Sequence, residues 1–228
     1  MTEPRSRRER PAKPALSRRW IVETAVRIMR DEGLEKVTMR RLAQELDTGP
    51  ASLYVYVANT AELHAAVLDD LLGTVDLTAP RAEEGDWHGQ LTAVLLGYAL
   101  ALFEHPQLAR SALVARPSGE NYLRLVERVL ALLAHSGAPT AQVAWGADVL
   151  LQQATAAAAE HSTRAGDPAR QRDWEALTHA LETVDPATHP AIRAHMPALV
   201  GGAGARLAWS VQALINGVVS TPVPPPHG

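Results

Sequence analysis

The chain has 228 residues, contains no cysteine and carries a formal net charge of −3 at pH 7. This length suffices for one large or two small domains with a hydrophobic core, and the lack of cysteine excludes disulfides, thiolate metal sites and cysteine nucleophiles. No apolar run approaches the roughly 18 residues that span a bilayer, and the polar N-terminus lacks the apolar core of a signal peptide. These features predict a cytoplasmic protein.

The charge is unevenly distributed along the chain. Residues 1–63 hold 12 Lys/Arg against 9 Asp/Glu, a net charge of +3, and the remainder holds 10 against 16, a net charge of −6. Residues 1–16 contain three prolines and no apolar period, which predicts a disordered basic arm. Such an arm suits contact with phosphates, although a solvated tail has the same composition, and both interpretations stay open.

Two short helices follow a first helix that is capped by Ser17 and stops near Gly33. Thr38 is placed to cap the second, whose apolar residues recur at the spacing of one buried helical face: Met39, Leu42, Ala43 and Leu46. The turn at 47–50 places a proline at the first position of the next helix, where Leu53 and Val57 face inward. Together 17–58 form a three-helix unit that matches a helix-turn-helix, whose second helix enters the major groove of DNA.

The rest of the chain reads as helices. Asn59 and Glu62 resemble a capping box for a helix from Thr60 to about Val75, and 76–86 reads as a link. Further helices are predicted at 87–105, 107–114, 118–136, 140–161, 169–184, 190–199 and 204–219. In the third of these we expect Ser118 as the cap and an inner stripe of Leu123, Val126, Leu130 and Leu133.

The helix at 140–161 has small residues over much of its surface, which suits a packed bundle or a dimer contact. No segment alternates as a strand does. The sequence therefore predicts an all-α protein with a helix-turn-helix domain at 17–63, a larger helical domain at 64–219 and a disordered tail at 220–228.

Four segments carry a resemblance to a known family. Asp31-Glu32-Gly33, Val37 to Ala43, Ser52 to Val57 and Glu62-Leu63 resemble the DNA-binding domain of the TetR family of bacterial transcriptional regulators. Pro117 to Leu123 and the proline-broken segment before the last helix are similar to the tetracycline-repressor-like branch. The resemblance implies a homodimer that contacts itself through the helices at 140–161 and 204–219, binds operator DNA and holds a small-molecule effector in its C-terminal domain.

The resemblance also implies which residues meet DNA. Thr38 and Arg40 begin the second helix, Thr60 begins the fourth, and the recognition segment supplies Pro50, Ala51, Ser52, Tyr54, Val55 and Tyr56. Many members carry lysine where this chain has Thr60, and Ala58 brings no charge either, so we expect the basic arm to compensate for a weaker phosphate contact there.

Candidates for the ligand pocket combine aromatic and amide side chains in the helical domain. They are Tyr98, Asn121, Trp145, Gln152, Gln153 and Trp174. Tyr98 lies on a core stripe, so plain packing is the simpler explanation of it.

Other chemistries find little support in the sequence. The histidines lack the spacing of a metal site, adjacent acidic pairs do not face each other on a helix, and no phosphate loop, nucleophile elbow or dinucleotide fingerprint occurs. We therefore expect no metal, no cofactor and no enzyme. The expected function is a DNA-binding regulator, most simply a repressor that binds a palindromic operator and is released by a small molecule. A helical interaction protein that kept the fold without specific DNA binding remains the alternative, and the residues leave repression and activation both open.

Overall fold

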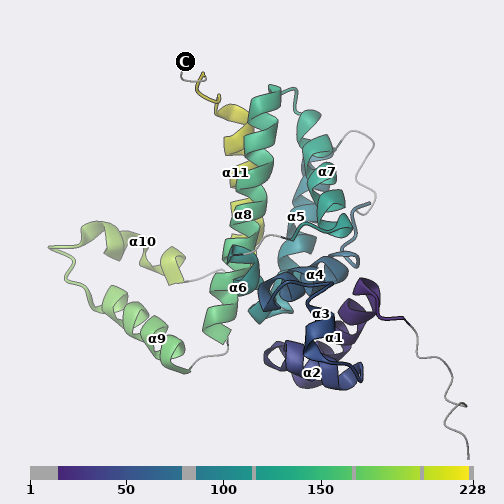
Figure 1. Ribbon diagram of the computed structural model, residues 1–228. Helices are drawn as coiled ribbons and strands as arrows, with labels where there is room; N and C mark the ends of the chain where they lie inside the picture. Colours follow the sequence, from purple (N-terminus) through teal and green to yellow (C-terminus); the bar gives the residue numbers. More distant parts are fainter. Residues whose placement is uncertain (1–14, 79–85, 115–116, 166–167, 201–202, 226–228) are drawn as a thin grey trace, which may run out of the picture. The chain divides into compact units, whose positions relative to one another are not determined.

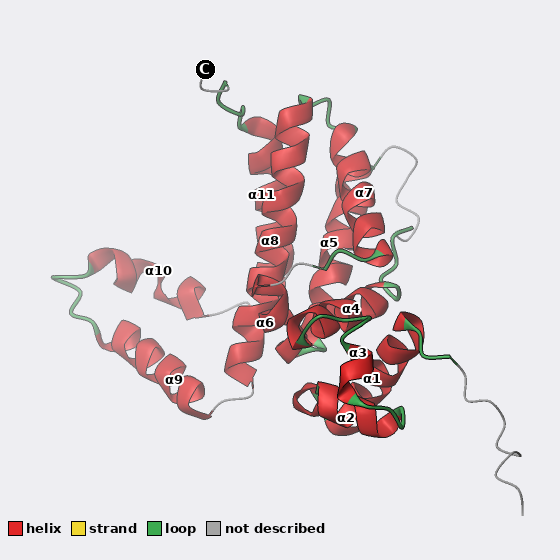
Figure 2. Ribbon diagram, in the orientation of Figure 1, coloured by secondary structure: helices red, strands yellow, loops and turns green. Residues whose placement is uncertain are grey.

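The computed structural model describes residues 15–78, 86–114, 117–165, 168–200 and 203–225. Every regular element within these ranges is a helix, and Figure 2 shows no strand among them. The expected all-α fold is confirmed. Most of the predicted basic arm, at 1–14, and the end of the predicted tail, at 226–228, lie outside the described residues.

The chain divides into two compact units, Met1–Leu63 and His64–Gly228. The first contains α1 (Arg18–Glu32), the 3₁₀ helix η1 (Leu34–Lys36), α2 (Met39–Glu45) and α3 (Pro50–Leu53). The division falls inside α4 (Thr60–Leu72), so one helix supplies residues to both units.

The helix starts of the first unit are capped as the sequence predicts. Ser17 and Thr38 each accept a hydrogen bond from the backbone N–H three residues further on. At α4, Asn59 accepts from the N–H of Glu62 at 2.8 Å, and the Glu62 carboxylate accepts from the N–H of Ala58 at 2.7 Å. These side chains satisfy N–H groups that have no partner inside the helices.

A buried apolar stripe packs these helices together. The side chains that the spacing predicted to face inward are all buried: Ile21, Ala25, Ile28, Met29, Met39, Leu42, Ala43, Leu46, Leu53 and Val57. Burying one large aliphatic side chain contributes roughly 1.5–3 kcal/mol relative to leaving it in water. Packing of this stripe therefore fixes α2 and α3 against α1.

The recognition segment is shorter as a helix than the sequence suggests. Regular α-helix ends at Leu53, and the N–H groups of Tyr56 and Val57 both bond to the Leu53 carbonyl, which makes a tight turn of residues 54–56. Aromatic and β-branched residues favour the helix less than unbranched ones, and four of them follow Leu53 in succession. The turn before α3 contains Asp47 at φ 46°, a left-handed conformation that aspartate tolerates.

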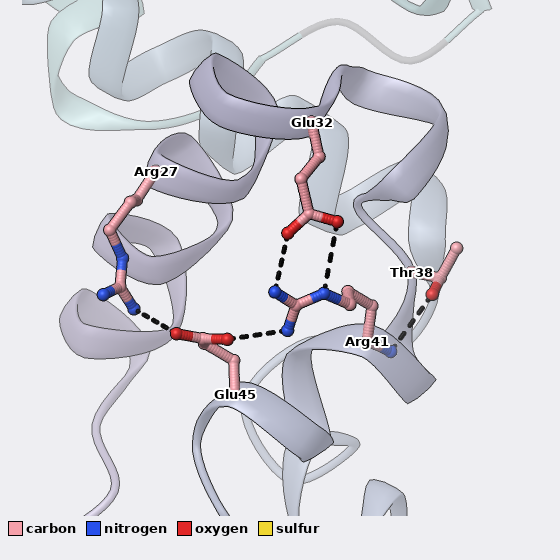
Figure 3. Close-up of polar contacts among 5 residues, drawn as sticks. All are labelled: Arg27, Glu32, Thr38, Arg41 and Glu45. Carbon is pink, nitrogen blue, oxygen red and sulfur yellow. Dashed lines mark hydrogen bonds and ion pairs between the residues drawn. The ribbon is translucent and has the colours of Figure 1, made fainter.

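An ion network ties α2 to α1 (Figure 3). Arg41 donates to both carboxylate oxygens of Glu32, at 2.6 and 3.3 Å, and to Glu45 at 2.7 Å. Glu45 in turn pairs with Arg27 at 3.1 Å. The hydrogen bonds that Arg41 donates to Glu32 and then to Glu45 raise the pKa of Arg41, and the hydrogen bond from Arg41 lowers the pKa of Glu45. The network fixes the angle at which α2 leaves α1.

The second unit contains the rest of α4 and seven further helices. These are α5 (Trp87–Phe103), α6 (Pro106–Val114), α7 (Glu120–Ala134), α8 (Thr140–Ala165), α9 (Pro168–Thr183), α10 (Pro190–Val200) and α11 (Ala203–Ser220). The long helix α8 contacts α5, α6, α7 and α11 and forms the centre of the unit (Figure 1). Among the described residues no single helix is long and apolar enough to cross a membrane; only the sharply bent pair Pro190–Val200 and Ala205–Ser220 meets that test together.

Helix α7 differs from the prediction in two ways. Its buried stripe consists of Leu125, Val129, Leu132 and Leu133, whereas the predicted Leu123 is 56% exposed and Val126 and Leu130 are half-buried. Leucines occur on several sides of this helix, so spacing alone selected the wrong stripe. The predicted cap Ser118 was also wrong, because Gly119 occupies the cap position and makes no side-chain hydrogen bond there.

Acid should weaken the first unit through Glu45. A carboxyl whose pKa is lowered by folding stabilises the folded state above its unfolded value, about 4.3 for glutamate, and this contribution disappears as the pH falls through the folded pKa. We expect the midpoint of thermal unfolding to fall less between pH 6 and pH 3.5 in Glu45→Gln than in the unsubstituted protein, as measured by circular dichroism. Glu104→Gln, with the same charge change in the other unit, serves as control. If the unfolding midpoint falls equally with pH in all three proteins, Glu45 does not have this stabilising role.

Two glycines test the close packing of α8 on α11. A Cβ added at Gly146 of α8 would collide with the Val218 side chain, whose branching at Cβ restricts its escape, whereas one at Gly97 of α5 meets only Val75 at 3.6 Å. Gly97→Ala should stabilise the protein by about 0.5–1 kcal/mol. Gly146→Ala gains the same helix stabilisation but also loses about 1–3 kcal/mol of stability through overpacking. The urea concentration at its unfolding midpoint should therefore be lower than that of Gly97→Ala. Equal midpoints would contradict this packing.

Candidate DNA-binding surface and ligand cavity

The residues expected to meet DNA are almost all on the surface of the first unit. The side chains at the starts of α2, α3 and α4 and in the turn after α3 are exposed: Thr38, Arg40, Pro50, Ala51, Ser52, Tyr54, Val55 and Thr60. Tyr54 and Val55 are 53% and 80% exposed, large values for side chains of this size. The surface therefore offers two apolar contacts and several hydroxyls.

Arg40 and Arg41 are neighbours with different roles. Arg41 is held by Glu32 and Glu45, as described above. Arg40 is exposed and makes no ion pair within the part of the chain that the structure describes. Thr38 uses its oxygen to accept from the N–H of Arg41 at 3.1 Å, which leaves its hydroxyl hydrogen to donate elsewhere. The start of α2 thus presents a cation and a donor beside the N-terminal end of a helix.

Tyr56 differs from the other members of the set. It is half-buried, and its hydroxyl donates to the backbone carbonyl of Leu16 at 2.8 Å. Arg18 donates to the Tyr56 carbonyl at 3.3 Å and to Glu62 at 2.9 Å. The hydrogen bond from the Ala58 N–H, and next that from Arg18, lowers the pKa of Glu62. Tyr56 therefore joins the turn after α3 to the segment that precedes α1.

The second unit contains a cavity of about 60 Å³ that is open to solvent. It is lined by Tyr98, Ala112, Leu113, Pro117, Tyr122, Leu151, Gln152 and Thr155. Tyr98 is buried, and its hydroxyl lies 2.8 Å from the hydroxyl of Thr155, which donates in turn to the Leu151 carbonyl at 2.9 Å. The lining residues that the structure describes carry no formal charge, and Gln152 supplies an exposed amide at the mouth.

Two of the six predicted ligand residues, Tyr98 and Gln152, line this cavity. Asn121 precedes the lining residue Tyr122 but donates to the Asp69 carbonyl at 2.9 Å. The other three lie elsewhere on the second unit: Trp145 and Gln153 on the exposed side of α8, and Trp174 on α9.

Sequence reasoning missed six lining residues. Thr155 lies three residues beyond Gln152, so helical spacing from Gln152 gave a signal for Thr155. Gln152 gave none for Leu151, because adjacent residues do not face the same way on a helix. Tyr122 falls within the segment 117–123 that carries the family resemblance, which was a second signal. Nothing in the spacing identified Ala112, Leu113 and Pro117, because the contact of α6 and the start of α7 with α8 is a tertiary one.

The outer sides of α8 and α11 combine exposed aromatic and small residues. Trp145 and Val149, one turn apart on α8, are 57% and 42% exposed, and Trp209 on α11 is 68% exposed. Exposed small residues accompany them: Ala141, Ala144, Ala213 and Gly217. Exposed apolar surface beside small residues is typical of a surface on which another helix packs closely.

Metal ligation is not indicated within the described ranges, where no group of three or more His, Cys, Asp or Glu side chains is placed to hold an ion. His88, on α5, lies 3.1 Å from the amide oxygen of Asn216.

Two family models match the chain, one in each unit for most of its length. The family model "Tetracyclin repressor-like, C-terminal domain" matches residues 79–221, and the model "Bacterial regulatory proteins, tetR family" matches residues 21–67. An HTH-type transcriptional regulator of Saccharopolyspora erythraea is 30% identical over 218 residues, which cover 95% of this chain and 90% of that protein.

Solved structures are similar over nearly the whole chain. The transcription regulator SCO7704 from Streptomyces coelicolor is 69% identical, with a TM-score of 0.80 and coverage of 94% of this chain and 100% of that chain. ActR of Streptomyces coelicolor in complex with actinorhodin is 32% identical, with a TM-score of 0.77 and coverage of 91% and 97%. The larger family model matches more than half of the chain, and with the helix-turn-helix of the first unit it shows that the chain belongs to the TetR family of bacterial transcriptional regulators, which are transcription factors and not enzymes.

Proposed function

We propose that this regulator is a repressor that binds a palindromic operator as a homodimer and is released by a small molecule. The observation that carries the proposal is the exposed surface formed by Arg40 and the α3 segment. Tyr54 and Val55 are exposed on this surface, and no packing contact within the described chain accounts for large side chains at these two positions. Because the operator is genomic DNA, the protein acts in the bacterial cytoplasm, at the nucleoid.

The DNA contacts divide by chemistry. Arg40 and the hydroxyls of Thr38, Tyr54 and Thr60 suit phosphate or sugar oxygens, which fix position. The side chains of α3 suit base edges, and the exposed Val55 suits the methyl group of thymine. In a twofold dimer the two recognition segments lie about 34–36 Å apart, one turn of B-DNA, so the operator is a near-palindrome.

The exposed sides of α8 and α11 are the proposed dimer contact. Symmetry would bring Trp145 and Trp209 of one protomer against the small residues of its partner. Large aromatic side chains with small ones opposite allow helices to approach closely and bury much apolar area.

The cavity of the second unit is the proposed effector site. Its described lining residues are uncharged and include a few polar groups, which suits a neutral small molecule. ActR, which is about one third identical to this chain, is a TetR family protein that binds actinorhodin, and this supports a small-molecule effector here. Linkage requires that the effector prefer the form released from DNA, and a coupling of about 1–3 kcal/mol changes operator affinity roughly 5- to 150-fold.

Substitutions on the proposed DNA surface should weaken operator binding. An operator is first selected from random-sequence duplexes with the unsubstituted protein, and affinities are then measured by fluorescence anisotropy at several salt concentrations. Arg40→Ala should cost about 1–3 kcal/mol and lower the salt slope by about one, because a phosphate contact is lost. Tyr54→Phe, which removes only the hydroxyl, should cost less than Tyr54→Ala.

The matched control is Arg30→Ala, which removes the same charge from an exposed residue of α1 in the same unit. Its salt slope and affinity should stay near those of the unsubstituted protein. If Arg30→Ala and Arg40→Ala lose operator affinity equally, the effect of Arg40 is one of overall charge and not of a specific contact. If no duplex can be selected, the alternative of a helical interaction protein is favoured.

A charge at the proposed dimer contact should separate the protomers. Trp209→Glu places a carboxylate where apolar surface would be buried, at a cost of several kcal/mol if it stays charged. We expect a dimer for the unsubstituted protein and a monomer for Trp209→Glu by light scattering after gel filtration. Leu123→Glu, at an apolar residue of α7 that is 56% exposed, should remain dimeric; a dimeric Trp209→Glu would place the contact elsewhere.

A further inference from the structure

The first turn of α7 is capped from α4. Gly119 stands at the cap position without a side chain, and the carboxylate of Asp69 takes over its role. One carboxylate oxygen accepts from the N–H of Tyr122 at 2.8 Å, and the other lies 3.5 Å from the N–H of Asn121. Asn121 returns a hydrogen bond from its amide to the Asp69 carbonyl at 2.9 Å. A negative charge at the start of a helix is also favoured by the helix dipole.

Two glycines allow this close approach. A Cβ at Gly119 would collide with the Asp69 carboxylate, and one at Gly73 would lie 3.2 Å from the amide nitrogen of Asn121. The capping arrangement of Asp69 on Gly119, Asn121 and Tyr122, here called the α4–α7 clamp, therefore leaves no room for a side chain at position 119. It fixes the C-terminal half of α4 to one specific turn of α7.

The same turn forms part of the cavity wall. The backbone N–H of Tyr122 donates to Asp69 in the clamp, and the residue also lines the cavity. Pro117 lines the cavity just before α7 begins. Sites for drug-sized ligands measure roughly 300–1,000 Å³, whereas this cavity measures about 60 Å³. A ligand of that size would displace some of the lining residues, and Tyr122 is one of those exposed to such a displacement.

We propose that Asp69 is the positioning residue that transmits occupancy of the cavity to α4. The proposal rests on the proposed function, since α4 matters only if its position affects DNA binding. A ligand that moves Tyr122 also moves its N–H, and the hydrogen bond to Asp69 either breaks or draws α4 along. Hydrogen bonds weaken steeply with distance and angle, so a small displacement is enough to change the clamp. Because α4 supplies residues to both units, its displacement reaches the DNA-binding unit through the chain itself.

A double-mutant cycle tests the proposal without knowledge of the effector. Ala112 is buried and lines the cavity, so Ala112→Phe puts a permanent occupant there. Operator affinity is measured for the unsubstituted protein, Ala112→Phe, Asp69→Ala and the double variant, on a duplex selected with the unsubstituted protein. We expect Ala112→Phe to weaken binding about 5- to 150-fold when Asp69 is present and less than about 2-fold when it is replaced.

Controls separate the clamp from general effects of charge and folding. Asp70→Ala removes the neighbouring charge, which is exposed, and should leave the full response to Ala112→Phe. Asp69→Asn keeps a carbonyl oxygen that accepts one N–H and should give an intermediate response. Gly119→Ala disturbs the clamp from the other side and should reduce the response as Asp69→Ala does. If Asp69→Ala fails to fold, these last two variants decide.

Hydrogen exchange gives a readout that does not involve DNA. Ala112→Phe should speed exchange of the α4 amides when Asp69 is present and leave it unchanged in the Asp69→Ala background. An equal effect of Ala112→Phe in both backgrounds, on affinity or on exchange, would overturn the proposal while leaving the regulator's function intact. An affinity that Ala112→Phe does not change at all would overturn it too. Failure of the unsubstituted protein to bind any selected duplex would instead contradict the proposed function.

Discussion

Contact of α8 with five other helices, α5, α6, α7, α9 and α11, is the constraint on which the second unit depends. A helix in that position must present a different side to each neighbour. Leu150, Ala154 and Ala158 are buried in the core, Leu151 and Thr155 face the cavity, and Trp145 remains exposed. Alanine and glycine make this possible, because small side chains let neighbouring helices approach without displacing one another. Core packing, the proposed effector site and the proposed dimer contact are therefore three sides of one helix.

Carboxylates form several of the polar links between helices in both units. Glu62 joins the start of α4 to Arg18, 44 residues earlier, and Asp69 joins α4 to a turn of α7 53 residues later. Glu32 joins α1 to α2 through Arg41, and Glu45 joins α2 to α1 through Arg27. Such contacts contribute modestly to stability when exposed, but their geometry is specific, so they determine which turn of one helix meets which turn of another.

The sequence predicted the local features well and the long-range ones poorly. Helix positions, the caps Ser17, Thr38 and Asn59 and the buried face of α2 follow from spacing and side-chain chemistry within one turn. The cap of α7 did not, because Ser118 has suitable chemistry in the right place, whereas the true partner comes from another helix. The cavity was found only where a core aromatic, Tyr98, coincided with it and where an exposed amide, Gln152, marked its mouth. The closeness of α6, α7 and α8 that completes the wall is decided by packing, which one-dimensional patterns do not encode.

The α4–α7 clamp has a consequence for how such a sensor evolves. Asp69 binds backbone N–H groups, which nearly every residue supplies, so the clamp constrains position 69 and the glycine at 119 but not the identity of the side chain at 122. That side chain is free to change with the ligand while its N–H stays in place. In the proposed mechanism, recognition and transmission draw on the same residue through different atoms, so a lineage could acquire a new effector by substitutions in the cavity wall without rebuilding the link to α4.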